Sequence, residues 1–328
     1  MTEHFVAMSN WPPGSQDPIG QSGEFLVWVE SMTQSGGGLH VFLPTLDRGI
    51  DGLLHRLHDR RYLATQVKTK TVIAHNEAVI AVVENHLFTD DQLIIGVQLE
   101  GDRLAEYLLI VDTGKFKKKA SRVIDRGRTL LVADMPVRPI PGHKWSEDLV
   151  RTADLATRLG VVLPEQIAAA PGAVPSDEDR VIGGWGEDEV TVRLDKLEDC
   201  GLFRPFPDNE TSEIAIRRLA TGKTIGIQVK TAQLDQRTSH RHIVILRSSF
   251  VPDPTTYVVA LAWIMPERRF HETCLLIPSE VVPSIAGMDG PYYRMYFNPG
   301  KSSEPSVVDP YRIPLETLAE EISARLEK

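Results

Sequence analysis

The chain has 328 residues, which is long enough for two domains that each bury a core. Its net charge of −9 argues against a surface coated with basic residues for nonspecific nucleic-acid binding, although a cluster of carboxylates that awaits a divalent metal would itself be negative. Two cysteines, Cys200 and Cys274, exclude a disulfide framework and a zinc-ligand pattern, so we expect a protein of the cytoplasm.

The first half of the chain predicts alternating helices and strands. Residues 1–21 are rich in Pro, Gly and Ser, lack the pattern of a signal peptide and predict an irregular lead-in. Apolar residues at helical spacing predict a helix over 23–35 that three glycines end, and a second helix over 145–159 with Ser146 as its cap. The segment 77–87 fits either helix or strand. Strands are expected over 39–43, 51–59, 61–71, 92–99 and 107–111.

The second half repeats this plan after a Pro- and Ser-containing stretch. We therefore predict domains over 1–165 and 180–328, joined by a linker over 166–179. No apolar stretch reaches the roughly 20 residues that cross a bilayer, so we expect no membrane partner. Helices are expected over 187–199 and 315–326, and strands over 213–219, 223–231 and 257–265. The alternation indicates an α/β fold with a mixed sheet in each half.

One tetrapeptide, Gln-Val-Lys-Thr, occurs twice, at 66–69 and at 228–231. Fifteen positions before each glutamine stands an acid, Asp51 in the first copy and Glu213 in the second. Further matches keep the same order along the chain at a slowly drifting offset. We interpret the sequence as an internal duplication.

The spacing within the first copy points to metal chemistry. A strand places residues i and i+2 on one face, so Gln66 and Lys68 should point to the same side, and Asp51 can reach them from the start of the neighbouring strand. A carboxylate, the Gln66 amide oxygen and the Val67 carbonyl oxygen between them are hard ligands that suit Mg²⁺ or Mn²⁺. An ammonium beside that metal can orient and help deprotonate an attacking water. The pattern predicts metal-assisted phosphodiester hydrolysis.

The segments Gly49-Ile50-Asp51 and Gln66-Val67-Lys68, preceded by a helix that holds Glu24, resemble the PD-(D/E)XK nuclease superfamily, the fold of many restriction enzymes and Holliday-junction resolvases. The resemblance implies two tandem restriction-endonuclease-like domains, each a mixed central sheet flanked by helices. It also implies that Asp51 and Gln66 bind the metal, that Lys68 acts on the water and that Glu24 is an auxiliary acid.

The second copy would contribute Glu213, Gln228 and Lys230 to a second site, with Glu187 as the auxiliary acid. Both copies carry Gln where Glu or Asp is more usual in the family, and Glu213 is one methylene longer than Asp. Asp208, which follows a proline, is an alternative strand acid, although register with the first copy favours Glu213.

Two functions follow from these residues. The first is a metal-dependent DNA endonuclease, or a nuclease-derived protein, that forms a pseudo-dimer within one chain. The alternative is a catalytically inactive nuclease-fold module for nucleic-acid or protein interaction, which the two glutamines and the acidic balance favour. Because Glu24 and Glu187 are expected near helix starts, the helix dipole alone would also explain them. Under the first function, Asp51 should lie within a few ångströms of Gln66 and Lys68 in a concave pocket. The oligomeric state, and whether one, both or neither site is active, stay open.

Overall fold

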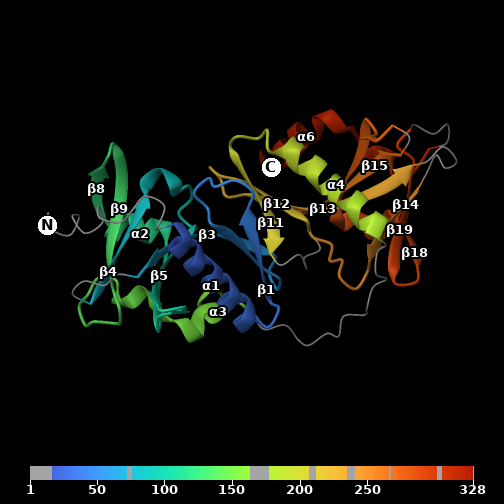
Figure 1. The fold of residues 1–328 in the computed structure, drawn as a ribbon. Helices are drawn as coiled ribbons and strands as arrows, with labels where there is room; N and C mark the ends of the chain where they lie inside the picture. Colours follow the sequence, from blue (N-terminus) through green and yellow to red (C-terminus); the bar gives the residue numbers. More distant parts are fainter. Residues whose placement is uncertain are drawn as a thin grey trace. The chain divides into compact units, whose positions relative to one another are not determined.

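Figure 1 shows a computed structural model of the chain. It describes residues 17–71, 76–162, 177–206, 212–234, 241–265, 267–300 and 305–327. The chain divides into two compact units, one made of residues 1–41 and 47–165 and the other of residues 42–46 and 166–328. Each unit is α/β, with a mixed central sheet flanked by helices, as the alternation of elements predicts.

The central sheet of the first unit is built around one long strand. Its strands are β1 (Leu39–Pro44), of which residues 39–41 belong to this unit, β2 (Gly52–Arg56), β3 (Arg61–Lys70), β5 (Leu93–Glu100), β6 (Arg103–Leu104), β7 (Tyr107–Asp112) and β10 (Leu149–Arg151). They lie in the order β10–β7–β5–β3–β2–β1, with β6 paired to the end of β5. Strand β3 is antiparallel to β2 and parallel to β5, and it therefore occupies the point where the sheet changes from antiparallel to parallel.

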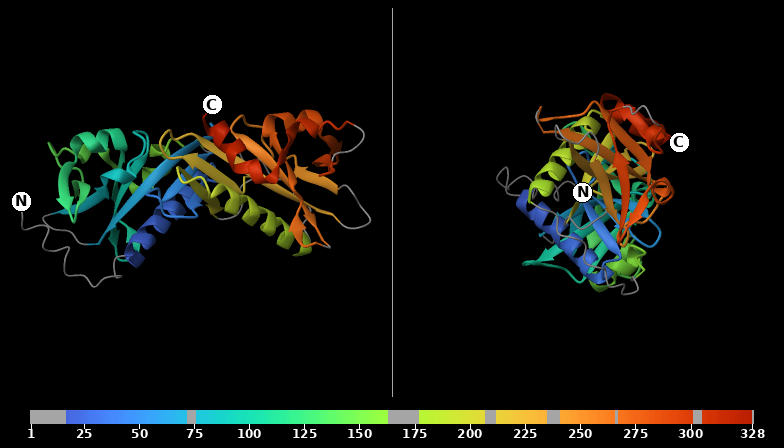
Figure 2. Two further views of the ribbon diagram at one scale, coloured as in Figure 1. Left: turned by 90° about the horizontal axis from the view of Figure 1, so that it is seen from above. Right: turned by 90° about the vertical axis from the view of Figure 1, so that its right-hand side faces the viewer.

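Two layers cover this sheet. Helices α1 (Asp17–Ser35) and α3 (Leu155–Arg158) lie on one face, and Figures 1 and 2 show α1 running along it. The approach of α1 is close, because a Cβ at Gly23 would stand 2.1 Å from Thr69 Oγ1. The opposite face carries α2 (Thr113–Lys119) and a small sheet in the order β4–β9–β8, and a Cβ at Gly96 would stand 2.0 Å from Ile80 of that sheet. These strands are β4 (Glu77–Val83), β8 (Ser121–Asp125) and β9 (Arg128–Pro136).

The second unit has the same plan. Its central strands are β11 (Cys200–Phe206), β12 (Ile214–Arg218), β13 (Thr224–Leu234), β15 (Thr256–Ile264), β16 (Arg269–Phe270), β17 (Thr273–Pro278) and β20 (Arg312–Pro314). They lie in the order β11–β12–β13–β15–β17–β20, with β16 paired to β15. Strand β13 is antiparallel to β12 and parallel to β15, which is the position that β3 has in the first unit.

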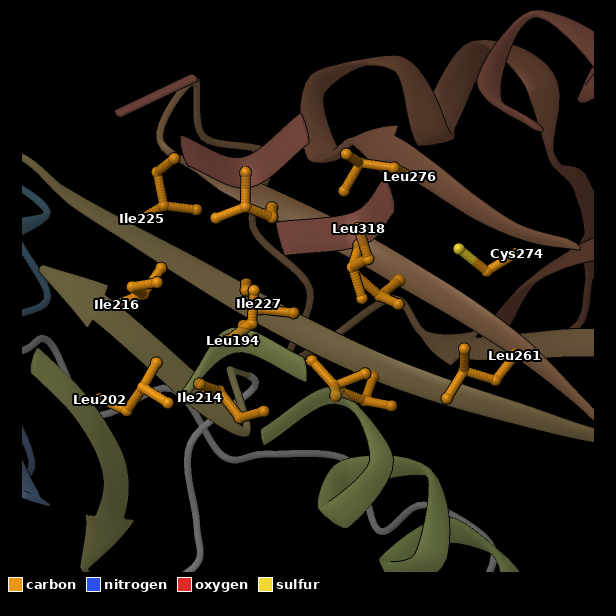
Figure 3. Packing of buried hydrophobic residues seen from close by; sticks show 14 of the residues in the cluster. Leu194, Leu202, Ile214, Ile216, Ile225, Ile227, Leu261, Cys274, Leu276 and Leu318 are labelled. Carbon is orange, nitrogen blue, oxygen red and sulfur yellow. The ribbon is translucent and has the colours of Figure 1, made fainter. Parts of the chain in front are cut away.

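The layers of the second unit also match. Helices α4 (Asp177–Leu194) and α6 (Leu318–Glu327) pack on one face, where Leu194 and Leu318 bury against strand residues such as Ile227 (Figure 3). The other face carries a small sheet in the order β14–β19–β18 and the short helix α5 (Val282–Ile285). The strands of this small sheet are β14 (Arg241–Leu246), β18 (Gly287–Asp289) and β19 (Tyr292–Phe297).

One helix prediction is wrong. Residues 145–159 form a 3-10 turn, Ser146–Asp148, the edge strand β10, a second 3-10 turn, Thr152–Asp154, and then only the short helix α3. The apolar spacing fits a helix, but Leu149 pairs with Leu109 of β7, and this tertiary pairing prevails over the local pattern. Ser146 caps no helix, because its hydroxyl exchanges hydrogen bonds with the backbone of Ile140.

Several predicted boundaries also change. Helix α1 begins at Asp17, so residues 17–21 are helical rather than irregular, and α4 spans Asp177–Leu194 rather than 187–199. The ambiguous segment 77–87 is mostly the strand β4, followed by a 3-10 turn, Glu84–His86. Of the predicted linker, residues 166–176 lie outside the described residues, and 177–179 belong to α4. The small sheets were not predicted beyond the ambiguous 77–87.

Candidate active site

The candidate site of the first unit lies where β3 extends past the end of β2. The last pair of this ladder joins Gly52 to Thr65, and the Asp51 backbone N–H donates to the Thr65 carbonyl at 2.9 Å. Beyond that point the Asp51 side chain replaces the backbone of β2 as the acceptor, because its Oδ2 accepts a hydrogen bond from the Val67 backbone N–H at 2.7 Å. The acid therefore supplies the hydrogen bond that a longer β2 would have given to β3.

Lys68 lies beside this carboxylate. Its Nζ is 3.6 Å from Asp51 Oδ2, the same oxygen that accepts from the Val67 N–H. Among the described residues both contacts therefore go to Oδ2, which leaves Oδ1 for another partner. The Asp51 side chain is 13% exposed and that of Lys68 is 29% exposed, so both remain partly accessible to solvent. Whether a concave pocket surrounds these atoms stays a prediction.

Gln66 occupies the same face of β3 as Lys68. The register pairs Gln66 with Ile94 and Lys68 with Gly96, and this is the face that the small sheet partly covers. The Gln66 side chain is only 2% exposed, and its Oε1 has no hydrogen-bond partner among the described residues. Because an unpaired buried carbonyl oxygen costs free energy, Gln66 Oε1 is a natural acceptor for a cation or a ligand donor.

Glu24 completes the acidic side of the site. Burial raises the pKa of Glu24 to about 7, with further upward contributions from Asp51 and Asp47 and an opposing one from Lys68. Burial also raises the pKa of Asp51, against the pull of Lys68 and of the Val67 N–H. Carboxylates that repel one another in a desolvated place hold protons unless a cation replaces them.

Glu24 lies in the middle of α1 rather than in its first turn. The helix dipole falls off within the first turn and therefore does not explain this acid. Its place follows instead from the neighbouring Gly23, which lets α1 approach Thr69 of β3 closely. Asp47 also bears on the site: its Oδ1 accepts from the Gly49 N–H at 2.9 Å, and its charge contributes to the raised pKa of both Glu24 and Asp51.

The second unit repeats the backbone arrangement. The Glu213 N–H donates to the Ile227 carbonyl at 2.9 Å, and Glu213 Oε2 accepts from the Val229 N–H at 2.8 Å. The other oxygen, Oε1, accepts from Lys230 Nζ at 3.0 Å, so both oxygens are occupied. Burial raises the pKa of Glu213, and Lys230 and the Val229 N–H oppose that rise.

The remaining residues of the second site follow the first. Gln228 is 6% exposed, and its Oε1 also lacks a partner within the described part of the chain. Glu187 follows Gly186 on α4, and a Cβ at Gly186 would stand 2.0 Å from Thr231 Oγ1. Like Glu24, Glu187 lies well inside its helix, outside the reach of the N-terminal dipole. Asp208, the alternative strand acid, lies outside the described residues.

The donors of the first site suit a hard cation of the Mg²⁺ type. Across the described ranges, no three His, Cys, Asp or Glu side chains gather closely enough to hold a metal by themselves. A metal beside Asp51 would therefore need oxygens from other groups, such as the Gln66 amide and the Val67 carbonyl. Glu24 approaches Asp51 from the α1 face, whereas Gln66 lies on the face toward the small sheet. The partnerless Gln66 Oε1 and the mutually repelling carboxylates both fit such a cation.

Comparisons with known proteins add little. No family model matches the chain, and no curated protein matches it. Among solved structures it is similar to a bacterial homing endonuclease, I-Ssp6803I, at 14% sequence identity; the match covers 47% of this chain and 99% of that one, with a TM-score of 0.33. No helix in the described ranges combines the length and hydropathy that crossing a bilayer requires.

Proposed function

We propose that this chain is an internally duplicated nuclease of the PD-(D/E)XK type, which hydrolyses DNA phosphodiester bonds with Mg²⁺ or Mn²⁺. The observation that carries the proposal is the two-sided role of Asp51. One oxygen fixes the carboxylate to β3 and lies 3.6 Å from Lys68, and the other is left for a cation beside Glu24.

Each residue then has a defined task. Asp51, Gln66, Glu24 and the Val67 carbonyl would hold the cation, which when bound supplies Lewis-acid polarisation of a phosphate oxygen. Lys68 would orient the attacking water and offset the negative charge that develops on the phosphoryl group. Glu24 would give up its proton as the cation binds, because its pKa of about 7 is set first by burial and then by repulsion from Asp51 and Asp47, and a bound cation would favour the ionised carboxylate.

The second unit is proposed to bind DNA rather than to cut it. The carboxylate of Glu213 uses both oxygens for Val229 and Lys230, so neither the acid nor the ammonium is available as in the first unit. Gln228 and Glu187 would then be remnants of a metal site. One cutting unit and one binding unit would act on a duplex as a pseudo-dimer within the chain.

An inactive module for nucleic-acid or protein interaction is the second candidate. The closed ion pair of the second unit favours it, because a first site that closed in the same way would have no place for a metal.

Titration of Mn²⁺ into the purified protein, followed by incubation with duplex DNA and Mg²⁺, tests the proposal. We expect metal binding at millimolar concentration or below, and strand cleavage that chelation abolishes. A protein that binds no metal in that range and leaves linear, supercoiled and branched DNA intact would be the interaction module instead.

A further inference from the structure

A second lysine follows Lys68 on the same face of β3. Lys70 lies two residues further along the strand, and its Cα partner on β5 is Gln98. The corresponding pair in the second unit is Ala232 and Ala262, and both alanines are buried in a hydrophobic cluster. The polar stripe that begins at Gln66 therefore continues in the first unit, whereas the second unit becomes apolar at the same register.

The charge of Lys70 is not compensated. Burial lowers the pKa of Lys70, and the positive charge of Lys68 lowers it further, with no opposing contribution. No carboxylate of the described residues lies within ion-pair distance of its Nζ. Other lysines of this unit differ, since Lys115 and Lys119 both pair with the buried Asp148. Because a partly desolvated cation without an acid is costly, its presence points to an anionic ligand.

Gln98 is a second sign that a ligand group is missing. Its side chain is 3% exposed, and Oε1 has no hydrogen-bond partner within the described part of the chain. The amide lies next to Lys70 across the sheet and can orient the ammonium once an anion draws it into place. The unpaired Gln98 oxygen and the Lys70 ammonium without an acid partner would both destabilise a hydrophobic core, whereas an anionic ligand bound at this place would pair with the ammonium.

We propose that Lys70 binds the DNA phosphate next to the one that is cleaved, on the same strand, with Gln98 as the residue that positions its ammonium. The inference rests on the proposed nuclease function and extends its site by one phosphate. Residues i and i+2 of a strand stand about 6.5–7 Å apart. That separation is comparable with the distance between consecutive phosphates of one nucleic-acid strand, so Lys68 and Lys70 can each face one of them.

The salt dependence of DNA binding tests this contact. Affinity for a short fluorescent duplex is measured by anisotropy with Ca²⁺ in place of Mg²⁺, over salt concentrations from about 50 to 200 mM. We expect Lys70→Gln to reduce the slope of log K against log salt by about 0.9, the value for one lost phosphate contact. Affinity should fall several-fold at the lower salt, and Lys70→Arg should restore both the slope and the affinity.

The exposed Lys118 of α2 provides the matched control, and Lys118→Gln should leave the slope unchanged. Thermal unfolding of each variant shows that it is folded. A Lys70→Gln slope equal to that of the wild type, or a loss equal to that of Lys118→Gln, would overturn this inference and leave the nuclease proposal standing. Wild-type protein that neither binds nor cuts DNA would instead overturn the proposed function, and the phosphate contact with it.

Discussion

The two candidate sites share a backbone and differ in how their acid and lysine meet. In both units an acid at the start of one strand donates its N–H to the next strand and accepts the N–H of the valine between Gln and Lys. In the first unit the lysine stays 3.6 Å from an oxygen that is already used. In the second unit the lysine donates to the other oxygen at 3.0 Å.

The extra methylene of Glu213 accounts for this difference. A longer side chain can reach the valine N–H with one oxygen and Lys230 with the other, whereas Asp51 makes both contacts through Oδ2. The shorter acid leaves a donor oxygen for a metal, and the longer one consumes it. The one additional methylene of Glu213 thus distinguishes the second site, where both carboxylate oxygens are paired, from the first site, where one oxygen of Asp51 is left for a metal.

The sharpest test of this comparison replaces each lysine in turn. We expect Lys68→Ala to reduce the cleavage rate by about 100- to 1,000-fold, because it removes a charge that acts on the developing phosphoryl group. Lys230→Ala should reduce the cleavage rate by about tenfold or less. Because it leaves the buried Glu213 carboxylate without its lysine, we expect it to lower the free energy of unfolding by about 2 kcal/mol. Cleavage assays and urea unfolding measure both effects. Equal losses of rate in the two variants would mean that both units cut.

Metal affinity should separate the two acids next. Asp51→Asn keeps an acceptor for the Val67 N–H but removes the charge, so we expect Mn²⁺ to bind about 10- to 100-fold more weakly. Glu213→Gln should leave Mn²⁺ affinity close to that of the wild type, because the oxygens of Glu213 are already occupied. Isothermal titration calorimetry reads both. A loss confined to Glu213→Gln would reverse the assignment of the open site.

Adding a methyl group where a helix approaches the sheet should destabilise both units to a similar degree. Gly23→Ala and Gly186→Ala each place a methyl group about 2 Å from a threonine hydroxyl, so we expect each to lower the free energy of unfolding by about 1–3 kcal/mol. Combining each change with alanine at the facing Thr69 or Thr231 should recover part of the loss. Thermal unfolding of the four variants measures this coupling. A variant as stable as the wild type would show that the helix can shift outward at no cost.

The smallest expected effect is the pH dependence of the metal-free protein. The pKa of Glu24 is raised from 4.5 to about 7, so between these values the folded protein holds a proton that the unfolded chain releases. The stability that this proton contributes is therefore lost as pH rises toward and past 7. Glu24→Gln should gain stability relative to the wild type between pH 5 and pH 8, by about 1 kcal/mol after allowance for solvent screening.

Urea unfolding at the two pH values checks this shift, and saturating Mn²⁺ should stabilise the wild type but not the variant at the higher pH. Glu187→Gln is the matched change in the second unit. A shift of the same size there would mean that burial against the sheet accounts for the raised pKa of Glu24 without the added repulsion from Asp51 and Asp47.

The acid and the Gln-X-Lys strand could be predicted because their evidence is local. The period of two along a strand fixes which face Gln66 and Lys68 share, and the repeated fifteen-residue step relates each acid to its strand. The helix over 145–159 could not be rejected in this way, because the pairing of Leu149 with Leu109 joins residues far apart in sequence. Asp47 and Lys70 were missed for a similar reason, since their roles depend on fields and burial that arise only after folding.

The hydrogen bond from the valine N–H to the acid also has an evolutionary consequence. Loss of Asp51 or Glu213 would leave a strand amide without an acceptor, whether or not any chemistry takes place beside it. Selection for folding alone would then preserve both acids in descendants that had ceased to cut anything. In this architecture an acid retained at position 51 or 213 reflects its structural hydrogen bond to the neighbouring strand. Retention of the glutamine and the lysines would be the better evidence that an enzyme is still active.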